Sequence, residues 1–138
     1  MPLAWNEIRH RAIKFSNEWK GAKSEAADKQ TFWNEFFNVF GVARRTVASF
    51  EAPVTKVSGH DGAIDLLWKG LLIVEHKSLG GDLSRAKSQA FDYIQNLAAE
   101  GRQKEIPRYV IVSDFARLVL YDLEPEEQSD LPLIRNAN

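Results

Sequence analysis

The sequence predicts a mixed α/β domain, with a mixed central β-sheet flanked by helices and elements in the order ααβββαββ. Three observations support this prediction. Near the N-terminus, apolar residues recur every three or four positions, as they do in amphipathic helices. Short apolar and β-branched segments follow, bounded by glycine and charged residues, as strands are. A long helical pattern separates the third strand from the last two, and this order of elements puts helices on both faces of a mixed sheet.

Two helices are predicted before the first strand. Residues 2–20 form the first, with an apolar stripe made of Trp5, Ile8, Ala12, Phe15 and Trp19. Residues 21–28 form a polar break or a frayed helical extension. The second helix covers residues 30–40 and ends at Gly41, a residue suited to the positive φ of a helix end. Its apolar face consists of Phe32, Trp33, Phe36, Phe37 and Phe40. So many large aromatic side chains on one face indicate burial against the sheet.

Three strands are expected in the middle of the chain. A short strand is predicted around residues 45–50, where the apolar residues alternate poorly, and residues 53–60 form a loop. Residues 62–68 and 71–77 are too short for helices and form a hairpin.

The second half of the chain contains one helix and two strands. Asp82 is a good N-cap for a helix over residues 83–99, whose stripe is closed by Gly101. Residues 108–113 and 117–122 are two further strands joined by a tight turn.

The length of 138 residues suits one domain and is short for two. We expect a single domain over residues 1–123, of which residues 1–27 are an N-terminal helical extension, and a tail or linker over residues 124–138. The chain has no cysteine, which excludes disulfides and thiolate metal sites and suits a reducing cytoplasm. No apolar run approaches the roughly 20 residues of a membrane span.

Charged residues occur where two apolar strands would otherwise continue. Asp65 lies in Gly62-Ala-Ile-Asp65-Leu-Leu-Trp68, and Glu75 and Lys77 end Leu71-Leu-Ile-Val-Glu75-His-Lys77. Glu75 and Lys77 are two apart and share one face of their strand. Burying them there is unfavourable without a compensating partner. A Mg²⁺ ion held by Asp65 and Glu75 would compensate the acids, and Lys77 would orient the attacking water or neutralise charge developing on a phosphate.

The hairpin register tests this arrangement. With a two-residue loop at Lys69-Gly70, Asp65 would pair with Val74 and point away from Glu75. With a three-residue loop over residues 69–71, Asp65 faces Glu75 directly. We therefore predict a three-residue loop, or a bulge near Asp65, with Gly70 at positive φ. An acid-x-lysine triplet alone is more often an exposed ion pair. The prediction of a metal site therefore depends largely on Asp65 at the matching position of the preceding strand.

Three further residues are candidates for supporting roles. Gln89 and Tyr93 are four apart on the predicted helix 83–99 and share one face, on the flank of its apolar stripe. The glutamine could reach a scissile phosphate and the tyrosine could hydrogen-bond beside it; the alternative is a surface glutamine and a half-buried tyrosine. Glu35 lies well off the apolar face of its helix and could turn toward the metal, or be an ordinary solvated glutamate.

The histidines and a second aspartate are weaker candidates. His76 should project away from Glu75, and His60 lies in a loop, so neither is assigned as a side-chain ligand. The backbone carbonyl of His76 is a candidate third metal ligand. Asp61 is a rival to Asp65, weaker because it precedes the strand.

These residues resemble the PD-(D/E)xK nuclease superfamily, in its RecB-like branch with a Gln-x-x-x-Tyr helix motif: Asp65, Glu75-His-Lys77 and Gln89-Ala-Phe-Asp-Tyr93. Ile64 replaces the proline of the family name. More narrowly, the chain resembles the N-terminal endonuclease domain of type IIL/IIG single-chain restriction–modification enzymes. That likeness covers roughly residues 28–123. It rests on Phe32–Gly41, Gly62–Trp68, Glu75–Lys77, Ser113-Asp114-Phe115 and Leu120-Tyr121-Asp122.

The resemblance implies a restriction-endonuclease-like core and a Mg²⁺-dependent DNA endonuclease, with Mn²⁺ as a substitute. It implies that Asp65 and Glu75 bind the metal, that Lys77 is the catalytic lysine and that Gln89 supports them; Glu35 carries over least securely. It further implies a methyltransferase and target-recognition partner, which the net charge of −1 also favours, because a protein that grips DNA alone is usually basic. A stand-alone RecB-like or resolvase-like nuclease of repair or defence, and a non-catalytic binding module, are the alternatives.

Overall fold

A five-stranded sheet with the strand order β1-β2-β3-β4-β5 forms the centre of the molecule in the computed structural model, which describes residues 2–22 and 25–124. Its strands are β1 (Ser49–Thr55), β2 (Asp61–Trp68), β3 (Leu72–His76), β4 (Tyr109–Ser113) and β5 (Leu118–Asp122). Neighbouring strands are antiparallel except β3 and β4, which are parallel. A parallel pair needs a crossover, and α4 (Leu83–Ala99) provides it. The predicted mixed α/β class is confirmed.

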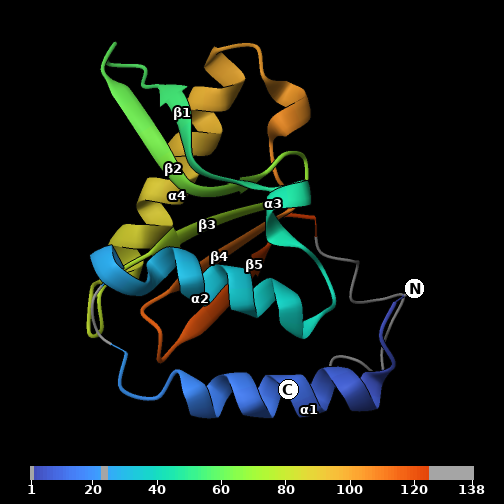
Figure 1. Ribbon diagram of the computed structural model, residues 1–138. Coiled ribbons are helices and arrows are strands. Elements are labelled where there is room, and N and C mark those ends of the chain that lie inside the picture. The colour runs from blue at the N-terminus through green and yellow to red at the C-terminus, as the bar shows by residue number, and fades with distance from the viewer. Residues whose placement is uncertain (1, 23–24, 125–138) are drawn as a thin grey trace, which may run out of the picture.

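Helices cover both faces of this sheet. On one side α2 (Glu25–Val39) lies across the strands and α1 (Trp5–Glu18) lies beyond it, as Figure 1 shows. On the other face α4 contacts β1, β3 and β4. Two short elements complete the fold, the single turn α3 (Arg44–Val47) and the 3₁₀-helix η1 (Gln103–Glu105).

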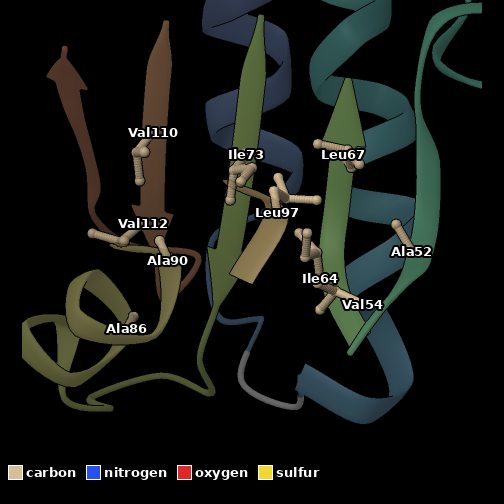
Figure 2. Packing of buried hydrophobic residues seen from close by; sticks show 10 residues of the cluster. All are labelled: Ala52, Val54, Ile64, Leu67, Ile73, Ala86, Ala90, Leu97, Val110 and Val112. Atoms are coloured by element: carbon tan, nitrogen blue, oxygen red, sulfur yellow. The ribbon is translucent and has the colours of Figure 1, made fainter. Parts of the chain in front are cut away.

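The sheet separates two apolar cores. Small and aliphatic residues fill the core beneath α4, which Figure 2 shows: Ala52, Val54, Ile64, Leu67, Ile73, Ala86, Ala90, Leu97, Val110 and Val112. Aromatic residues dominate the core beneath α2: Phe32, Trp33, Phe37, Ala48, Leu66, Leu72, Val74, Ile111 and Phe115. The aromatic face predicted for the second helix is therefore buried as expected, apart from Phe40, which is 45% exposed.

The prediction of a strand over residues 45–50 and a loop over 53–60 is wrong. Residues 44–47 form the turn α3, and β1 runs on through Pro53 to Thr55. Arg44 stabilises the turn, because its guanidinium donates to Asn34 Oδ1 at 2.7 Å and to the Ala48 carbonyl at 2.8 Å. Pro53 is tolerated because β1 is an edge strand, where a missing N–H is harmless.

The helix boundaries differ from the predictions in a smaller way. The second helix starts at Glu25 rather than residue 30, since the alanine-, glutamate- and lysine-rich segment read as a polar break has good helix propensity. The first helix is shorter than predicted, 5–18 against 2–20. Apart from Glu124, the tail predicted over 124–138 lies outside the described residues.

The β2–β3 hairpin has the predicted three-residue loop. Trp68 pairs with Leu72, and Leu71 N–H donates to the Trp68 carbonyl at 2.9 Å. Gly70 has a φ of 78°, as expected for this turn. The side-chain alternation of β2 also shifts at Asp65, because Ile64 and Leu67 face α4 whereas Leu66 faces α2. The register that brings Asp65 opposite Glu75 is therefore confirmed.

Candidate active site

Two hydrogen bonds between side chain and backbone hold Asp65 and Glu75 next to each other. The ladder between β2 and β3 ends at Leu66 and Val74, one residue before these acids. Beyond that point Glu75 Oε2 accepts from the Asp65 backbone N–H at 2.9 Å, and Asp65 Oδ2 accepts from the His76 N–H at 2.8 Å. Each carboxylate is thus held by the backbone of the opposite strand, which fixes both groups side by side.

Burial makes this pair of acids unusual. Glu75 is only 4% exposed and the Asp65 side chain 15%. Burial, and then the charge of Asp65, raises the pKa of Glu75 to about 8, against the lowering effects of the Asp65 N–H, Lys77 and Lys29. At neutral pH Glu75 therefore retains a proton unless a cation arrives. Strong perturbation of a buried acid is typical of functional sites.

Lys77 reaches the same place from the end of β3. Its ammonium donates to Gln89 Oε1 of α4 at 2.6 Å. A Cβ on Gly81 would lie 2.6 Å from the Lys77 Cβ, so the absence of a side chain at Gly81 leaves room for the lysine. The structure therefore brings Gln89, predicted to support the site, into contact with Lys77.

Tyr93 lies one helical turn after Gln89 and close to both acids. Burial raises the pKa of its hydroxyl, and the charges of Glu75 and Asp65 raise it further. Lys56 lies over the ring, with its ammonium 6.0 Å from the ring centroid. The structure thus places Tyr93 one turn from Gln89 on α4, where the charges of both carboxylates act on its hydroxyl and raise its pKa.

The Ser113-Asp114-Phe115 motif holds the loop that follows Lys77. The Lys77 N–H donates to the Ser113 carbonyl at 2.8 Å, and the Gly80 N–H donates to Asp114 Oδ2 at 3.1 Å. Burial raises the pKa of Asp114, but hydrogen bonds from Arg117 and Gly80 outweigh it, so the pKa lies below its ordinary value. This motif therefore fixes the backbone at Lys77 and in the loop that follows it.

The His76 side chain points to the opposite face, as predicted. It is fully buried among aromatic rings, and Nδ1 accepts from Trp33 Nε1 at 2.9 Å. Burial lowers its pKa to about 4, so the ring is neutral at neutral pH. Nε2 has no hydrogen-bond partner among the described residues. The ligand role of the His76 carbonyl stays a prediction.

Two residues at the site were missed by the sequence reasoning. The Lys29 ammonium donates to Asp65 Oδ1 at 3.0 Å and to Glu51 Oε1 at 3.2 Å. Burial lowers the pKa of Lys29, but hydrogen bonds and charges of Asp65 and Glu51 outweigh it and leave it raised. Placing β1 at 49–55 would have found Glu51, since the register sets it opposite Asp65. Nothing local in the sequence indicated Lys29.

Other candidates are not brought to this site. Glu35 accepts from Trp19 Nε1 at 2.9 Å and lines a groove between α1 and α2, so its supporting role has no geometric backing. Asp61 is exposed at the start of β2, far along the strand from the β2–β3 turn, and His60 is exposed in the segment between β1 and β2. Asp65 is the better placed of the two aspartates.

The donor set suits a hard divalent cation. Within residues 2–22 and 25–124, no group of three or more acidic or histidine side chains forms a ready-made metal cluster. Mg²⁺ does not require one, because it usually keeps several waters and binds through one or two carboxylates. A cation would also compensate the charge that burial disfavours on Glu75. Asp65 and Glu75 therefore fit Mg²⁺ as its two protein ligands.

Comparison with known proteins places this geometry in a family. A family model described as "MmeI, N-terminal domain" matches residues 10–135. The chain belongs to the MmeI N-terminal domain family. MmeI is a type IIG restriction enzyme, so the chain corresponds to the N-terminal region of a restriction enzyme. No curated protein and no solved structure matches the chain.

The family assignment agrees in part with the resemblance drawn from the motifs. The match includes every residue of the site, from Lys29 to Tyr93, and the Ser113-Asp114-Phe115 turn. Among the described residues, no helix combines the length and apolar character needed to cross a bilayer. Membership in the MmeI N-terminal domain family connects the chain with restriction and hence with DNA.

Proposed function

We propose that this chain is the Mg²⁺-dependent endonuclease domain of a restriction–modification enzyme, of the PD-(D/E)xK type, and that it hydrolyses phosphodiester bonds of DNA. The observation that carries the proposal is the convergence of Asp65, Glu75 and Lys77 from two antiparallel strands. The family match to a restriction enzyme's N-terminal domain supports the same reading.

The two acids would hold the cation. Bound Mg²⁺, or Mn²⁺ in its place, would stabilise negative charge on the phosphate as a Lewis acid. Asp65 and Glu75 are already oriented for this by the reciprocal backbone bonds, so little reorganisation is required. Glu75 must first lose its proton, because its pKa of about 8 keeps it neutral in the absence of a cation.

Lys77 supplies the second electrostatic element. Gln89 accepts one of the three N–H bonds of the ammonium, which orients the others. These remaining donors would orient the attacking water or neutralise the charge developing on the scissile phosphate. Gln89 is a positioning residue in this scheme, and Tyr93 would hydrogen-bond beside the acids.

Sequence specificity would come from elsewhere. The net charge of −1 supplies no broad basic surface for DNA. We therefore propose that a methyltransferase and target-recognition partner delivers the DNA, as expected for a restriction–modification enzyme of the cytoplasm. The cleavage domain would then contribute chemistry to a complex held by that partner.

Plasmid nicking tests the function. The chain at high concentration is incubated with supercoiled plasmid and Mg²⁺ or Mn²⁺, beside Lys77→Ala and Asp65→Asn. We expect metal-dependent nicking that both variants lose. Lys69→Ala, which removes an exposed lysine in the hairpin loop, should nick like the parent chain. Nicking that persists in Asp65→Asn and Lys77→Ala would refute the assignment.

A further inference from the structure

Lys29 forms a partly buried ionic bridge at the candidate metal site, in which the Glu51 side chain is 51% exposed. It lies on the first turns of α2, and its side chain is only 14% exposed. The ammonium joins Asp65 of β2 and Glu51 of β1, at 3.0 and 3.2 Å. Lysine is almost never buried without a partner, so this position has a specific cause. The cause is the negative charge at the end of the β2–β3 ladder.

The backbone of β1 is deformed where it meets this bridge. Glu51 lies between the pairs Phe50–Leu66 and Ala52–Ile64, so the register sets it opposite Asp65. Its φ of 49° is in the left-handed region, which non-glycine residues adopt at a cost in free energy. Phe50 packs in the core beneath α2 and Ala52 in the core beneath α4, so the strand changes face at Glu51. This deformation accompanies the contact between Glu51 and Lys29.

Asp65 is consequently shared between two kinds of contact. Oδ2 is engaged by the His76 N–H and Oδ1 by Lys29. A cation that binds Asp65 must approach a carboxylate which already has an ammonium 3.0 Å away. Like charges a few ångströms apart repel strongly in a partly buried site.

We propose that Lys29 is the internal counter-cation of the metal site. In the absence of metal it holds the Asp65 carboxylate in place, and it competes with the divalent ion for that carboxylate. Glu51 is the second anchor of the ammonium and receives it when metal displaces it from Asp65. This inference rests on the proposed function, because it assumes that Asp65 and Glu75 hold the metal. Lys29 is thus a positioning residue that sets the metal affinity.

The competing interpretation is that Lys29 only fastens α2 to the sheet. In that case its removal would lower stability and leave metal affinity unchanged. If Lys29 is the counter-cation, its removal instead makes the site more negative and tightens metal binding. The direction of the change in affinity therefore separates the two interpretations.

Calorimetric titration with Mn²⁺, without DNA, measures this affinity in the intact chain. Lys29→Met keeps much of the apolar stem and removes the charge. We expect its Mn²⁺ affinity to rise by about tenfold or more, because a charge that repels the ion has been removed. Lys29→Arg keeps the charge and should bind like the parent chain. Lys14→Met is the matched control, since it removes one exposed positive charge from α1, beyond α2, and should also change nothing.

A double-mutant cycle provides a second measurement should Lys29→Met fail to fold, which circular dichroism would reveal. Glu51→Gln removes the carboxylate that would receive the displaced ammonium and should weaken Mn²⁺ binding by about threefold or more. If Lys29→Met folds, Glu51→Gln should weaken Mn²⁺ binding less in that background than in the parent chain, because the effects of coupled residues are not additive.

The outcomes distinguish this inference from the proposed function. Tighter binding in Lys29→Met, with parent-like binding in Lys29→Arg and Lys14→Met, supports the counter-cation. Unchanged or weaker binding in a folded Lys29→Met overturns it, as does an unchanged affinity in Glu51→Gln when only that variant folds. If Asp65→Asn still abolishes binding and nicking, the proposed function survives that failure. A parent chain that binds no Mn²⁺ overturns both.

Discussion

Replacement of Glu75 by glutamine measures how much the protonation of this one buried side chain contributes to the free energy of unfolding. Glutamine has the shape of protonated glutamate, and its carbonyl oxygen can still accept the Asp65 N–H that Glu75 Oε2 accepts at 2.9 Å. In metal-free buffer, the folded parent chain holds the Glu75 proton up to a pH of about 8, whereas the unfolded chain releases it near the ordinary value of 4.5. Between these values the folded state binds more protons, so its stability falls as pH rises.

The size of the effect follows from linkage. Each pH unit in this window corresponds to about 1.4 kcal/mol. Between about pH 5 and pH 8 the parent chain should therefore lose up to about 4 kcal/mol of stability relative to Glu75→Gln. The contribution is fully present below pH 4.5 and is lost as pH passes through about 8. The glutamine variant should be the more stable protein at neutral and alkaline pH.

Urea unfolding in the presence of EDTA, followed by tryptophan fluorescence, measures both free energies across this pH range. All other titrating groups are common to the two proteins, so their difference reports Glu75. A difference that varies by less than about 0.5 kcal/mol between pH 5 and pH 8 would refute the reasoning, since it would mean that Glu75 ionises normally in the folded chain.

Three further predictions follow from the same geometry. Mn²⁺ binding at about pH 7 should release nearly one proton from the parent chain, as measured by calorimetry in buffers of different ionisation enthalpy; binding without proton release would contradict the pKa assigned to Glu75. Trp33→Phe removes the donor to His76 Nδ1 and should lower the unfolding free energy by about 2–4 kcal/mol in urea titrations, through an unsatisfied buried nitrogen and lost packing. Gly70→Ala should lower the melting temperature more than Gly101→Ala does. Both glycines have positive φ, but only at Gly70 would the new Cβ lie 3.1 Å from a backbone carbonyl oxygen. Equal decreases in melting temperature would show that this contact has no cost.

Local sequence patterns were sufficient for the hairpin and its acids. Apolar residues on both sides of Lys69-Gly70 defined two short strands, and the parity of side chains required a three-residue loop, or a bulge near Asp65, to bring Asp65 to Glu75. Gln89 and Tyr93 could be placed on one face of α4 by helical periodicity, and Gln89 does meet Lys77. These inferences succeed because they depend on separations of a few residues within one element or one hairpin.

The start of β1 could not be read from the sequence. The apolar pattern of residues 45–50 is interrupted by the turn α3, which Arg44 stabilises through contacts with Asn34 and Ala48. The strand then changes face at Glu51, where alternation fails. Because β1 was predicted at the wrong residues, the sequence did not indicate that Glu51 lies opposite Asp65.

The sequence by itself determined the mixed α/β class, the hairpin register and the pair of acids with its lysine, because each follows from short-range periodicity and turn geometry. Only the tertiary structure decided that Glu75 retains a proton, since burial sets its pKa. It also decided that Glu35 faces α1 through Trp19 whereas Lys29 enters the site, 36 residues before Asp65 in the chain. Which residue of α2 faces the site depends on the rotation of this helix on the sheet. That rotation is set by the packing of the whole aromatic face and not by a local motif.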